Sequence, residues 1–198
     1  MASDSKHEAI MSAARQEFAR KGFHGAVVSD IARAAGVGKG TVYRRFGNKE
    51  QLFAGLIKNG SHELLNRIEA AGRSGSSPLE SLQNCVDVYF DFFRHSREIF
   101  EIVVTEGKQR VGRVHSELMQ NDARIRGYLS ALFRSGMDQG IFRSQDPDKL
   151  ALLFHNTVWS FMRWAIISNE DIEYSRELIP EVFLYGIRNP DVPLESFQ

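Results

Sequence analysis

Apolar residues recur at intervals of three and four along almost the whole chain, which is the spacing of one buried face of an α-helix. Strand-like alternation extends over no more than a few positions, and no internal repeat is present. Glycine and proline punctuate the helical pattern. The sequence therefore predicts an all-α fold with about nine helices, at residues 5–22, 28–35, 39–46, 48–71, 78–93, 97–106, 111–139, 146–168 and 172–187.

Residues 31–46 predict two short helices joined by a tight turn. Gly36 stands where the first helix ends and a left-handed residue is needed, which glycine adopts without steric cost. Val42 and Phe46 lie four residues apart and share the inner face of the second helix. The outer face of that helix carries Lys39, Gly40, Thr41, Tyr43 and Arg44. Cations, a hydroxyl, an aromatic ring and a glycine are the groups that a recognition helix presents to a DNA major groove.

An ordinary αα-hairpin with a solvated basic face is the alternative interpretation, and the flanking residues decide against it. Many spaced positions match one pattern at once: Phe18, Gly22-Phe23, Ile31-Ala32, Ala35-Gly36-Val37, Lys39-Gly40-Thr41-Val42-Tyr43, Phe46, Asn48-Lys49-Glu50 and Leu52. Over roughly residues 8 to 55 the chain resembles the N-terminal domain of the TetR (tetracycline-repressor-like) family of transcriptional regulators. The resemblance implies a three-helix DNA-binding domain that contains a helix-turn-helix.

The resemblance also assigns DNA contacts outside the recognition helix. Lys49 matches a lysine that contacts the DNA backbone in the family, and Ser29 is expected to take over part of a phosphate contact at the start of its helix. Two positions depart from the family pattern. Val27 stands where a threonine commonly caps the helix, and Gly38 stands where serine is frequent. These departures put the phosphate contacts at 27 and 38 in doubt without threatening the fold.

The net charge of zero conceals a division along the chain. Residues 1–60 carry ten Lys/Arg and five Asp/Glu, a balance of +5, and residues 61–198 therefore carry −5. A basic N-terminal part favours a polyanionic partner, because phosphate contacts supply most non-specific DNA affinity. The glycine- and serine-rich stretch at 72–78 is the clearest break in the chain. We therefore expect a DNA-binding domain at 1–50, a connecting helix at 48–71, and a ligand-binding and dimerisation domain at 72–198.

The C-terminal helices predict a dimer. Residues 150–167 are apolar on nearly every side, and a helix of this kind must be covered on every side. A partner subunit is the natural cover for one face, and a two-fold dimer would place two recognition helices about one turn of DNA apart on a near-palindromic operator. The expected dimer interface consists of His155, Trp159, Met162, Ile166, Ile179, Val182 and Phe183.

Family resemblance further implies a small-molecule effector bound in the C-terminal helices. The residues expected to line its pocket are Tyr89, Phe93, Arg97, Phe100, Val104, Tyr128, Phe133, Phe154 and Val158. An aromatic stripe at helical spacing is more often packed core than pocket, so both interpretations stay open. If a pocket is present, its lining predicts a hydrophobic or aromatic ligand.

Several classes of function find no support in the sequence. No apolar run approaches the roughly 20 residues of a membrane span, the N-terminus lacks a signal-peptide core, and the single cysteine, Cys85, suits a reducing cytoplasm. Neither metal-ligand spacing nor a catalytic or cofactor motif is present, so no metal, cofactor or enzymatic activity is expected. The sequence predicts a cytoplasmic, homodimeric, ligand-responsive DNA-binding regulator, most simply a repressor. The alternative is a helical small-molecule binding or interaction protein without specific DNA binding.

Overall fold

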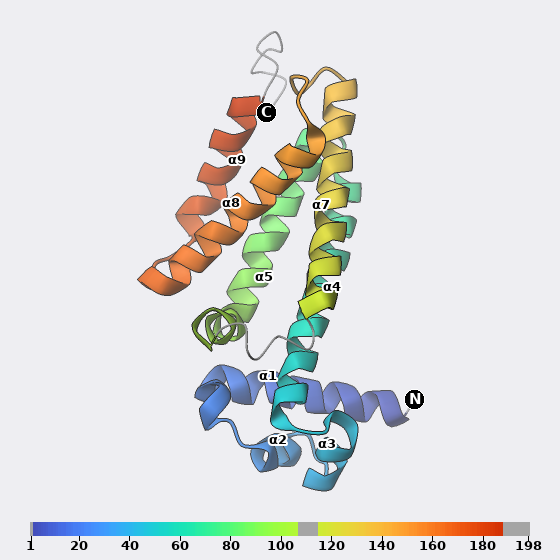
Figure 1. The fold of residues 1–198 in the computed structure, drawn as a ribbon, viewed down its shortest axis with the longest axis vertical. Helices are drawn as coiled ribbons and strands as arrows, with labels where there is room; N and C mark the ends of the chain where they lie inside the picture. The colour runs from blue at the N-terminus through green and yellow to red at the C-terminus, as the bar shows by residue number, and fades with distance from the viewer. Residues whose placement is uncertain (1, 107–114, 188–198) are drawn as a thin grey trace. The chain divides into compact units, whose positions relative to one another are not determined.

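The computed structural model describes residues 2–106 and 115–187, in which helices joined by short connections form the fold, as Figure 1 shows. The helices are α1 (Ala2–Gly25), α2 (Val28–Ala34), α3 (Lys39–Phe46), α4 (Lys49–Ser74), α5 (Pro78–Glu106), α7 (His115–Asp138), α8 (Pro147–Ser168) and α9 (Glu173–Ile187). The predicted all-α fold is confirmed. Among the described residues, no helix is both long enough and apolar enough to cross a membrane.

The chain forms two compact units. The first comprises Met1–Ser61 together with Ser96–Leu118, and the second comprises His62–His95 together with Met119–Gln198. The boundaries of these compact units therefore differ from the expected domain boundaries at residues 50 and 72. The expected assignment of functions to 1–50 and 72–198 stays a prediction.

The first unit is organised around an aromatic core. The rings of Phe18, Phe23 and Phe53 contact one another, with centroid separations of 5.0 to 5.7 Å. Ile102, from the last part of α5, is buried in the same cluster. Within this unit α2 and α3 lie on the same side of α1 (Figure 1). The core thus holds the helix-turn-helix against α1 and the start of α4.

α1 contains a break that the sequence located but did not fully describe. Gly22 has a φ of 67° and a ψ of 178°, which interrupts the helical conformation. The expected helix end at Gly22 is therefore a kink, and one further turn follows before the chain leaves α1 at Gly25. The chain then passes through Ala26 and Val27 into α2.

The second unit has an interior of apolar and aromatic side chains from α5, α7, α8 and α9. Phe133, Phe154 and Phe183 form a ring cluster with centroid separations of 5.1 to 5.9 Å. α8 begins as expected, because the Asp146 carboxylate accepts from the backbone N–H groups of residues 148 and 149, and Pro147 occupies the first turn.

One helix boundary was predicted wrongly. The sequence suggested separate helices at 78–93 and 97–106, whereas α5 runs without interruption from Pro78 to Glu106. The physical reason is visible in the sequence, since neither glycine nor proline occurs between residues 79 and 106. Ser96, which lies at the expected break, is 6% exposed and fits inside the packed helix.

Candidate nucleic-acid interface

The turn between α2 and α3 has the predicted geometry. Gly36 has a φ of 65°, in the left-handed region where glycine is favoured. Its N–H donates to the carbonyl of Arg33 at 3.1 Å, and the N–H of Val37 donates to the carbonyl of Ala32 at 3.0 Å. The side chain of Val37 packs against the core of the first unit. Glycine thus ends α2 and apolar contact fixes the turn.

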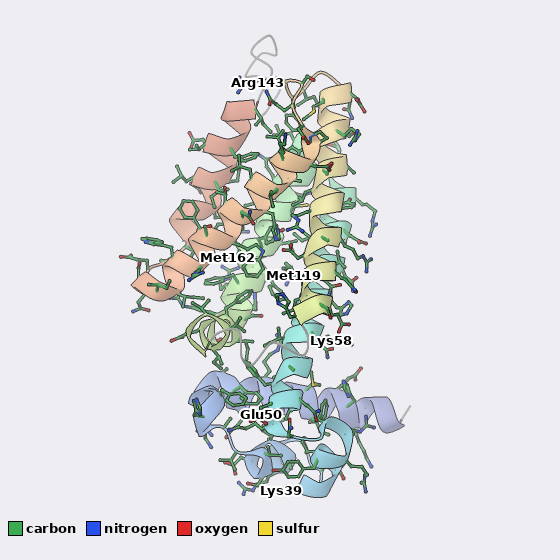
Figure 2. The ribbon with its side chains drawn as sticks, in the orientation of Figure 1. Lys39, Glu50, Lys58, Met119, Arg143 and Met162 are labelled. Carbon is green, nitrogen blue, oxygen red and sulfur yellow. The ribbon has the colours of Figure 1, made fainter. Side chains whose placement is uncertain are left out.

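α3 buries one face and exposes the other. Val42 is 2% exposed, and Phe46 is partly buried against the same core. Figure 2 labels Lys39 on this helix, where it is exposed. The outer face predicted from the sequence consists of four exposed residues, Lys39, Gly40, Tyr43 and Arg44, and the half-buried Thr41. The expected division of α3 into an inner and an outer face is confirmed.

The outer face of α3 combines cationic, hydroxyl and aromatic groups. The Arg44 guanidinium donates to the Thr41 hydroxyl at 3.4 Å, and the Lys39 ammonium lies 5.6 Å from the centre of the Tyr43 ring. Tyr43 is 41% exposed, which is high for an aromatic side chain. These groups can donate to base edges and phosphates and can contact thymine methyl groups.

The two departures noted in the sequence lie at the residues that directly precede α2 and α3. Val27 and Gly38 both have extended backbones, and neither supplies a side-chain cap. Ser29 lies in the first turn of α2 and is half-buried. A phosphate contact by Ser29 stays a prediction.

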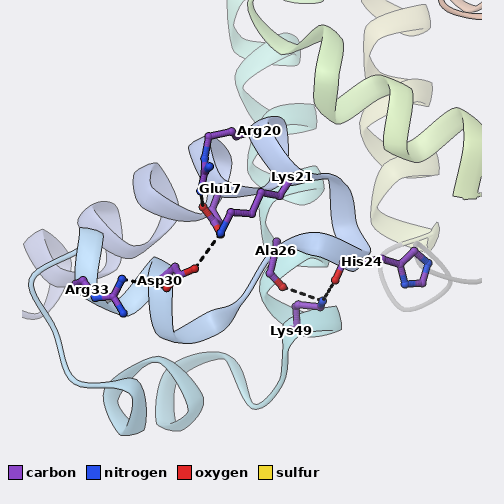
Figure 3. Close-up of polar contacts among 8 residues, drawn as sticks. All are labelled: Glu17, Arg20, Lys21, His24, Ala26, Asp30, Arg33 and Lys49. Atoms are coloured by element: carbon purple, nitrogen blue, oxygen red, sulfur yellow. Dashed lines mark hydrogen bonds and ion pairs between the residues drawn. The ribbon is translucent and has the colours of Figure 1, made fainter.

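A network of charged groups joins α1 to α2 (Figure 3). The Lys21 ammonium lies 2.6 Å from a Glu17 carboxylate oxygen and 2.9 Å from an Asp30 carboxylate oxygen. The hydrogen bond from Lys21 is the main reason that the pKa values of both carboxyl groups lie below their ordinary values, and it raises the pKa of Lys21 itself. Arg20 pairs with Glu17 and Arg33 pairs with Asp30. The first turn of α2 is thereby attached to α1.

Lys49 has intramolecular partners that the sequence did not predict. Its Nζ donates to the carbonyl of Ala26 at 3.0 Å and to the carbonyl of His24 at 3.3 Å (Figure 3). The same nitrogen lies 4.7 Å from the centre of the Phe23 ring. The side chain is half-buried rather than exposed. The cation expected to face the DNA backbone therefore contacts the turn between α1 and α2.

The chain matches known families over both of its halves. Residues 10–56 match the family described as "Bacterial regulatory proteins, tetR family", and residues 78–165 match "Tetracyclin repressor-like, C-terminal domain". The chain belongs to the tetR family of bacterial regulatory proteins. The resemblance drawn from residues 8 to 55 is confirmed, and with it the expectation of a ligand-responsive DNA-binding transcriptional regulator.

Proteins with similar sequences are also named as regulators. The HTH-type transcriptional repressor KstR2 of Mycobacterium tuberculosis is 25% identical over 163 residues, which cover 81% of this chain and 82% of that protein. The fatty acid metabolism regulator protein of Bacillus subtilis is 25% identical over 190 residues, which cover 93% of this chain and 96% of that protein. The crystal structure of the transcriptional regulator FadR from Bacillus subtilis in complex with stearoyl-CoA matches with a TM-score of 0.74 and 20% identity, covering 92% of this chain and 100% of that one.

In this tetR-family chain, the residues expected to line an effector pocket fall into both units. Tyr89, Phe93, Tyr128, Phe133, Phe154 and Val158 belong to the second unit, and Arg97, Phe100 and Val104 belong to the first. Within the second unit all but Tyr128 are at most 1% exposed. These five side chains are packed core in the structure described here, and their role as ligand contacts stays a prediction.

The residues expected at the dimer interface also divide by burial. His155, Met162 and Ile179 are at most 3% exposed within the subunit, and Phe183 contacts Phe133 and Phe154. Figure 2 labels Met162 on α8. Val182, also expected at the interface, is 64% exposed, and α8 exposes four apolar residues that were not among those expected there: Leu152, Leu153, Trp164 and Ile167. A shallow depression of about 440 Å³ on α8 includes Leu152, Leu153 and Phe161. If α8 and α9 form a dimer interface, these exposed residues supply more of its area than His155 or Met162.

The structure reveals a polar cluster inside the second unit that the sequence analysis missed. Tyr89, Asp122 and His155 come from α5, α7 and α8, and His155 contacts both of the others. Asp122 also pairs with Arg126. Tyr89 and His155 stand in apolar helical patterns and Asp122 stands among polar residues of α7, so no local signal could have brought the three together.

Proposed function

We propose that this tetR-family protein is a homodimeric transcriptional repressor that binds a near-palindromic operator and releases it when a small hydrophobic or aromatic effector binds. The observation that carries the proposal is the outer face of α3. It holds Lys39, Tyr43 and Arg44 exposed on a helix whose other face is fixed in the core. Gly40 and Thr41 complete the surface that enters the major groove.

Electrostatics support the DNA-binding part of this proposal. Residues 1–60 have a formal charge of +5 against −5 for the remainder. Phosphate contacts release condensed counterions, so affinity for DNA falls steeply as salt increases. A helical binding or interaction protein without specific DNA recognition would not combine this salt dependence of DNA affinity with a preference for one DNA sequence.

The nature of the effector is inferred from the interior of the second unit and from similar proteins. The interior is rich in aromatic side chains, among them Phe93, Phe133 and Phe154. The crystal structure of FadR from Bacillus subtilis contains stearoyl-CoA, a ligand with a long apolar chain. An effector with a large apolar part is therefore the first class to test, with stearoyl-CoA as a probe and free coenzyme A as its control.

The dimer is supported by the exposed apolar residues of α8 and α9. Ile167 is 65% exposed and Val182 is 64% exposed, and residues of this type are costly to leave in water. Sedimentation should give a dimer for the parent protein and a shift toward monomer for Ile167→Asp. A pure monomer of the parent at micromolar concentration would contradict the dimer.

Selection of bound duplexes from a random DNA pool tests the function as a whole. Recovery of a palindromic site with half-sites about one helical turn apart is the expected result. Tyr43→Ala should then weaken binding to that site and leave the oligomeric state unchanged. Failure of a folded, dimeric protein to select any sequence, also after unfolding, extraction and refolding to remove bound ligand, would favour the alternative of a helical binding protein without specific DNA recognition.

A further inference from the structure

Asp30 places a negative charge in the helix-turn-helix. It lies in the first turn of α2, whereas residues 1–60 as a whole carry twice as many Lys/Arg as Asp/Glu. The hydrogen bond from Lys21 is the main reason that the pKa of Asp30 lies below its ordinary value, so the carboxyl group is ionised at neutral pH. An anion in the first turn stabilises a helix, but it repels the phosphates of DNA bound nearby. Charge alone therefore predicts that Asp30 weakens DNA binding.

The two carboxylate oxygens of Asp30 have different partners (Figure 3). Oδ2 lies 2.9 Å from the ammonium of Lys21 on α1, and Oδ1 lies 3.1 Å from the guanidinium of Arg33 on α2 itself. The Arg33 side chain is 78% exposed, and an exposed ion pair within one helix contributes little. Lys21 and Asp30 are half-buried, and their ion pair joins two helices. The contact with Lys21 is therefore the one that can hold α2 in place.

Glu17 fixes Lys21 in this position. The Glu17 carboxylate lies 2.6 Å from the Lys21 ammonium, and its side chain is only 9% exposed. Moving Lys21 away would take from this buried carboxylate its shortest ion pair, which is costly in a site that is shielded from water. One ammonium group thus connects a fixed point on α1 to the first turn of α2.

α2 depends on directional contacts of this kind. It has seven residues, Val27 gives its start no side-chain cap, and isolated helices of this length are unstable. Its buried residues, Val28, Ile31 and Ala32, pack against the core of the unit, but apolar contact is non-directional. A hydrogen-bonded ion pair has a preferred distance and direction, so it limits how far α2 can rotate or shift on that core. α3 follows after the tight turn at Gly36, so the position of α2 governs that of the outer face of α3.

We propose that Asp30 is a positioning residue for DNA recognition, which acts through Lys21 and Glu17 to hold α2, and with it the outer face of α3, in the arrangement that fits the operator. The inference rests on the proposed DNA-binding function. Its consequence is opposite to that of charge alone, because a negative charge in the DNA-binding unit then raises operator affinity. The alternatives are an anion that weakens binding to all DNA and an anion that only stabilises the fold.

Asp30→Asn distinguishes positioning from charge by the sign of its effect. Asparagine keeps the size of the side chain and removes its negative charge, so loss of repulsion alone would strengthen binding to every duplex. For the operator recovered by DNA selection we expect roughly tenfold weaker binding, about the effect of one lost hydrogen bond to a charged group. Binding to an unrelated duplex of the same length should be unchanged or stronger. Operator binding as tight as that of the parent or tighter, or an equal loss with both duplexes, overturns the proposal.

Glu50→Gln is the matched control. Glu50 is an exposed carboxylate in the first turn of α4, so this change removes the same charge and a similar interaction with a helix dipole. It should bind the operator at least as tightly as the parent. Equal weakening by Glu50→Gln and Asp30→Asn overturns the proposal. All affinities are measured well below the melting temperatures, where each protein is fully folded, so a role in stability alone would leave operator affinity unchanged.

A double-mutant cycle tests whether Asp30 acts through Lys21. Two groups that act through one contact have effects that are not additive. In a Lys21→Met background, Asp30→Asn should therefore no longer weaken operator binding. A further loss of the same size in that background overturns the proposal. If Lys21→Met melts too low because it deprives Glu17 of its partner, Glu17→Gln is added to the background and to its reference protein.

Failure of the proposed function is distinguishable from failure of this inference. A parent protein that is folded and binds no duplex at any salt concentration contradicts DNA binding, and the role of Asp30 falls with it. A parent that selects an operator, together with an Asp30→Asn variant that binds it equally well, leaves DNA binding established and rejects only the positioning role.

Discussion

The phenol of Tyr89 on α5 and the imidazole of His155 on α8 form a hydrogen bond of 2.6 Å in the interior of the second unit. The other ring nitrogen of His155 contacts the carboxylate of Asp122. Burial raises the pKa of Asp122, but the hydrogen bond from His155 and the charge of Arg126 outweigh this effect, and the pKa lies below its ordinary value. An ionised carboxylate only accepts, so His155 donates to Asp122, and in the neutral imidazole the nitrogen that faces Tyr89 accepts from the phenol. Burial raises the pKa of Tyr89, which keeps its proton in place.

Tyr89→Phe should destabilise the second unit. The change leaves a buried ring nitrogen of His155 without its donor, which costs about 1–3 kcal/mol in the free energy of unfolding. Urea unfolding of parent and variant measures the difference. Tyr43→Phe removes an exposed phenol and serves as the control, with an expected change within about 0.5 kcal/mol. Equal stability of Tyr89→Phe and the parent would show that the hydrogen bond contributes nothing net.

Two glycines of α7 should respond to alanine in opposite directions. A Cβ added at Gly136 would overlap the Phe142 ring, whereas a Cβ at Gly127 would meet no atom within 4 Å. Gly136→Ala should therefore lower the free energy of unfolding by about 1–3 kcal/mol through overpacking. Gly127→Ala should raise it by up to about 1 kcal/mol, because alanine is the better helix former. A stabilising Gly136→Ala would mean that Phe142 moves aside without cost.

The network around Lys21 should make the stability of the fold depend on pH in the acid range. The pKa of Glu17 lies below its ordinary value of 4.5, mainly because Lys21 donates to it. A carboxyl group whose pKa is lowered by folding stabilises the fold above its unfolded pKa, and this contribution disappears as pH falls through the folded pKa. Glu17→Gln should therefore melt earlier than the parent at neutral pH, and the gap should close in acid. A gap that is constant across this pH range would contradict the linkage.

Gly40→Ala should separate stability from DNA binding. Gly40 lies in α3, has ordinary helical geometry, and has no atom within 4 Å of the position of an added Cβ. The fold alone therefore gains from alanine, by up to about 1 kcal/mol. If the α3 backbone approaches DNA closely at this position, the same change should weaken operator binding. Calorimetry and binding at fixed salt measure both effects, and unchanged affinity would show that DNA does not approach Gly40.

Local sequence signals predicted the parts of the fold that neighbouring residues determine. Gly36 in the turn, the inner-face pair Val42 and Phe46, and the Asp146 cap depend on residues within a few positions of one another. The Asn48 side chain accepts from the N–H of Gln51 at 2.8 Å, so the cap at the start of α4 likewise depends on residues three positions apart. The division of α3 into an inner and an outer face could therefore be predicted from the sequence alone.

Contacts between distant residues could not be predicted in this way. The partners of Lys49 lie 23 and 25 residues earlier and are backbone carbonyls, which no side-chain pattern reveals. The Tyr89–His155 hydrogen bond spans 66 residues. Burial of His155 and Met162 also depends on how α8 is rotated in its unit, and a helix that is apolar on every side does not encode that rotation.

The two compact units are joined through helices, with consequences for how such proteins can be recombined. α4 passes from Ser61 to His62, α5 from His95 to Ser96, and α7 from Leu118 to Met119, without leaving the helical conformation. Each residue of an α-helix turns the chain by about 100°, so a single inserted residue at any of these crossings changes the phase of every side chain beyond it within the helix. A chimera that combines the first unit of this chain with the second unit of a relative must therefore preserve helical phase at all three crossings.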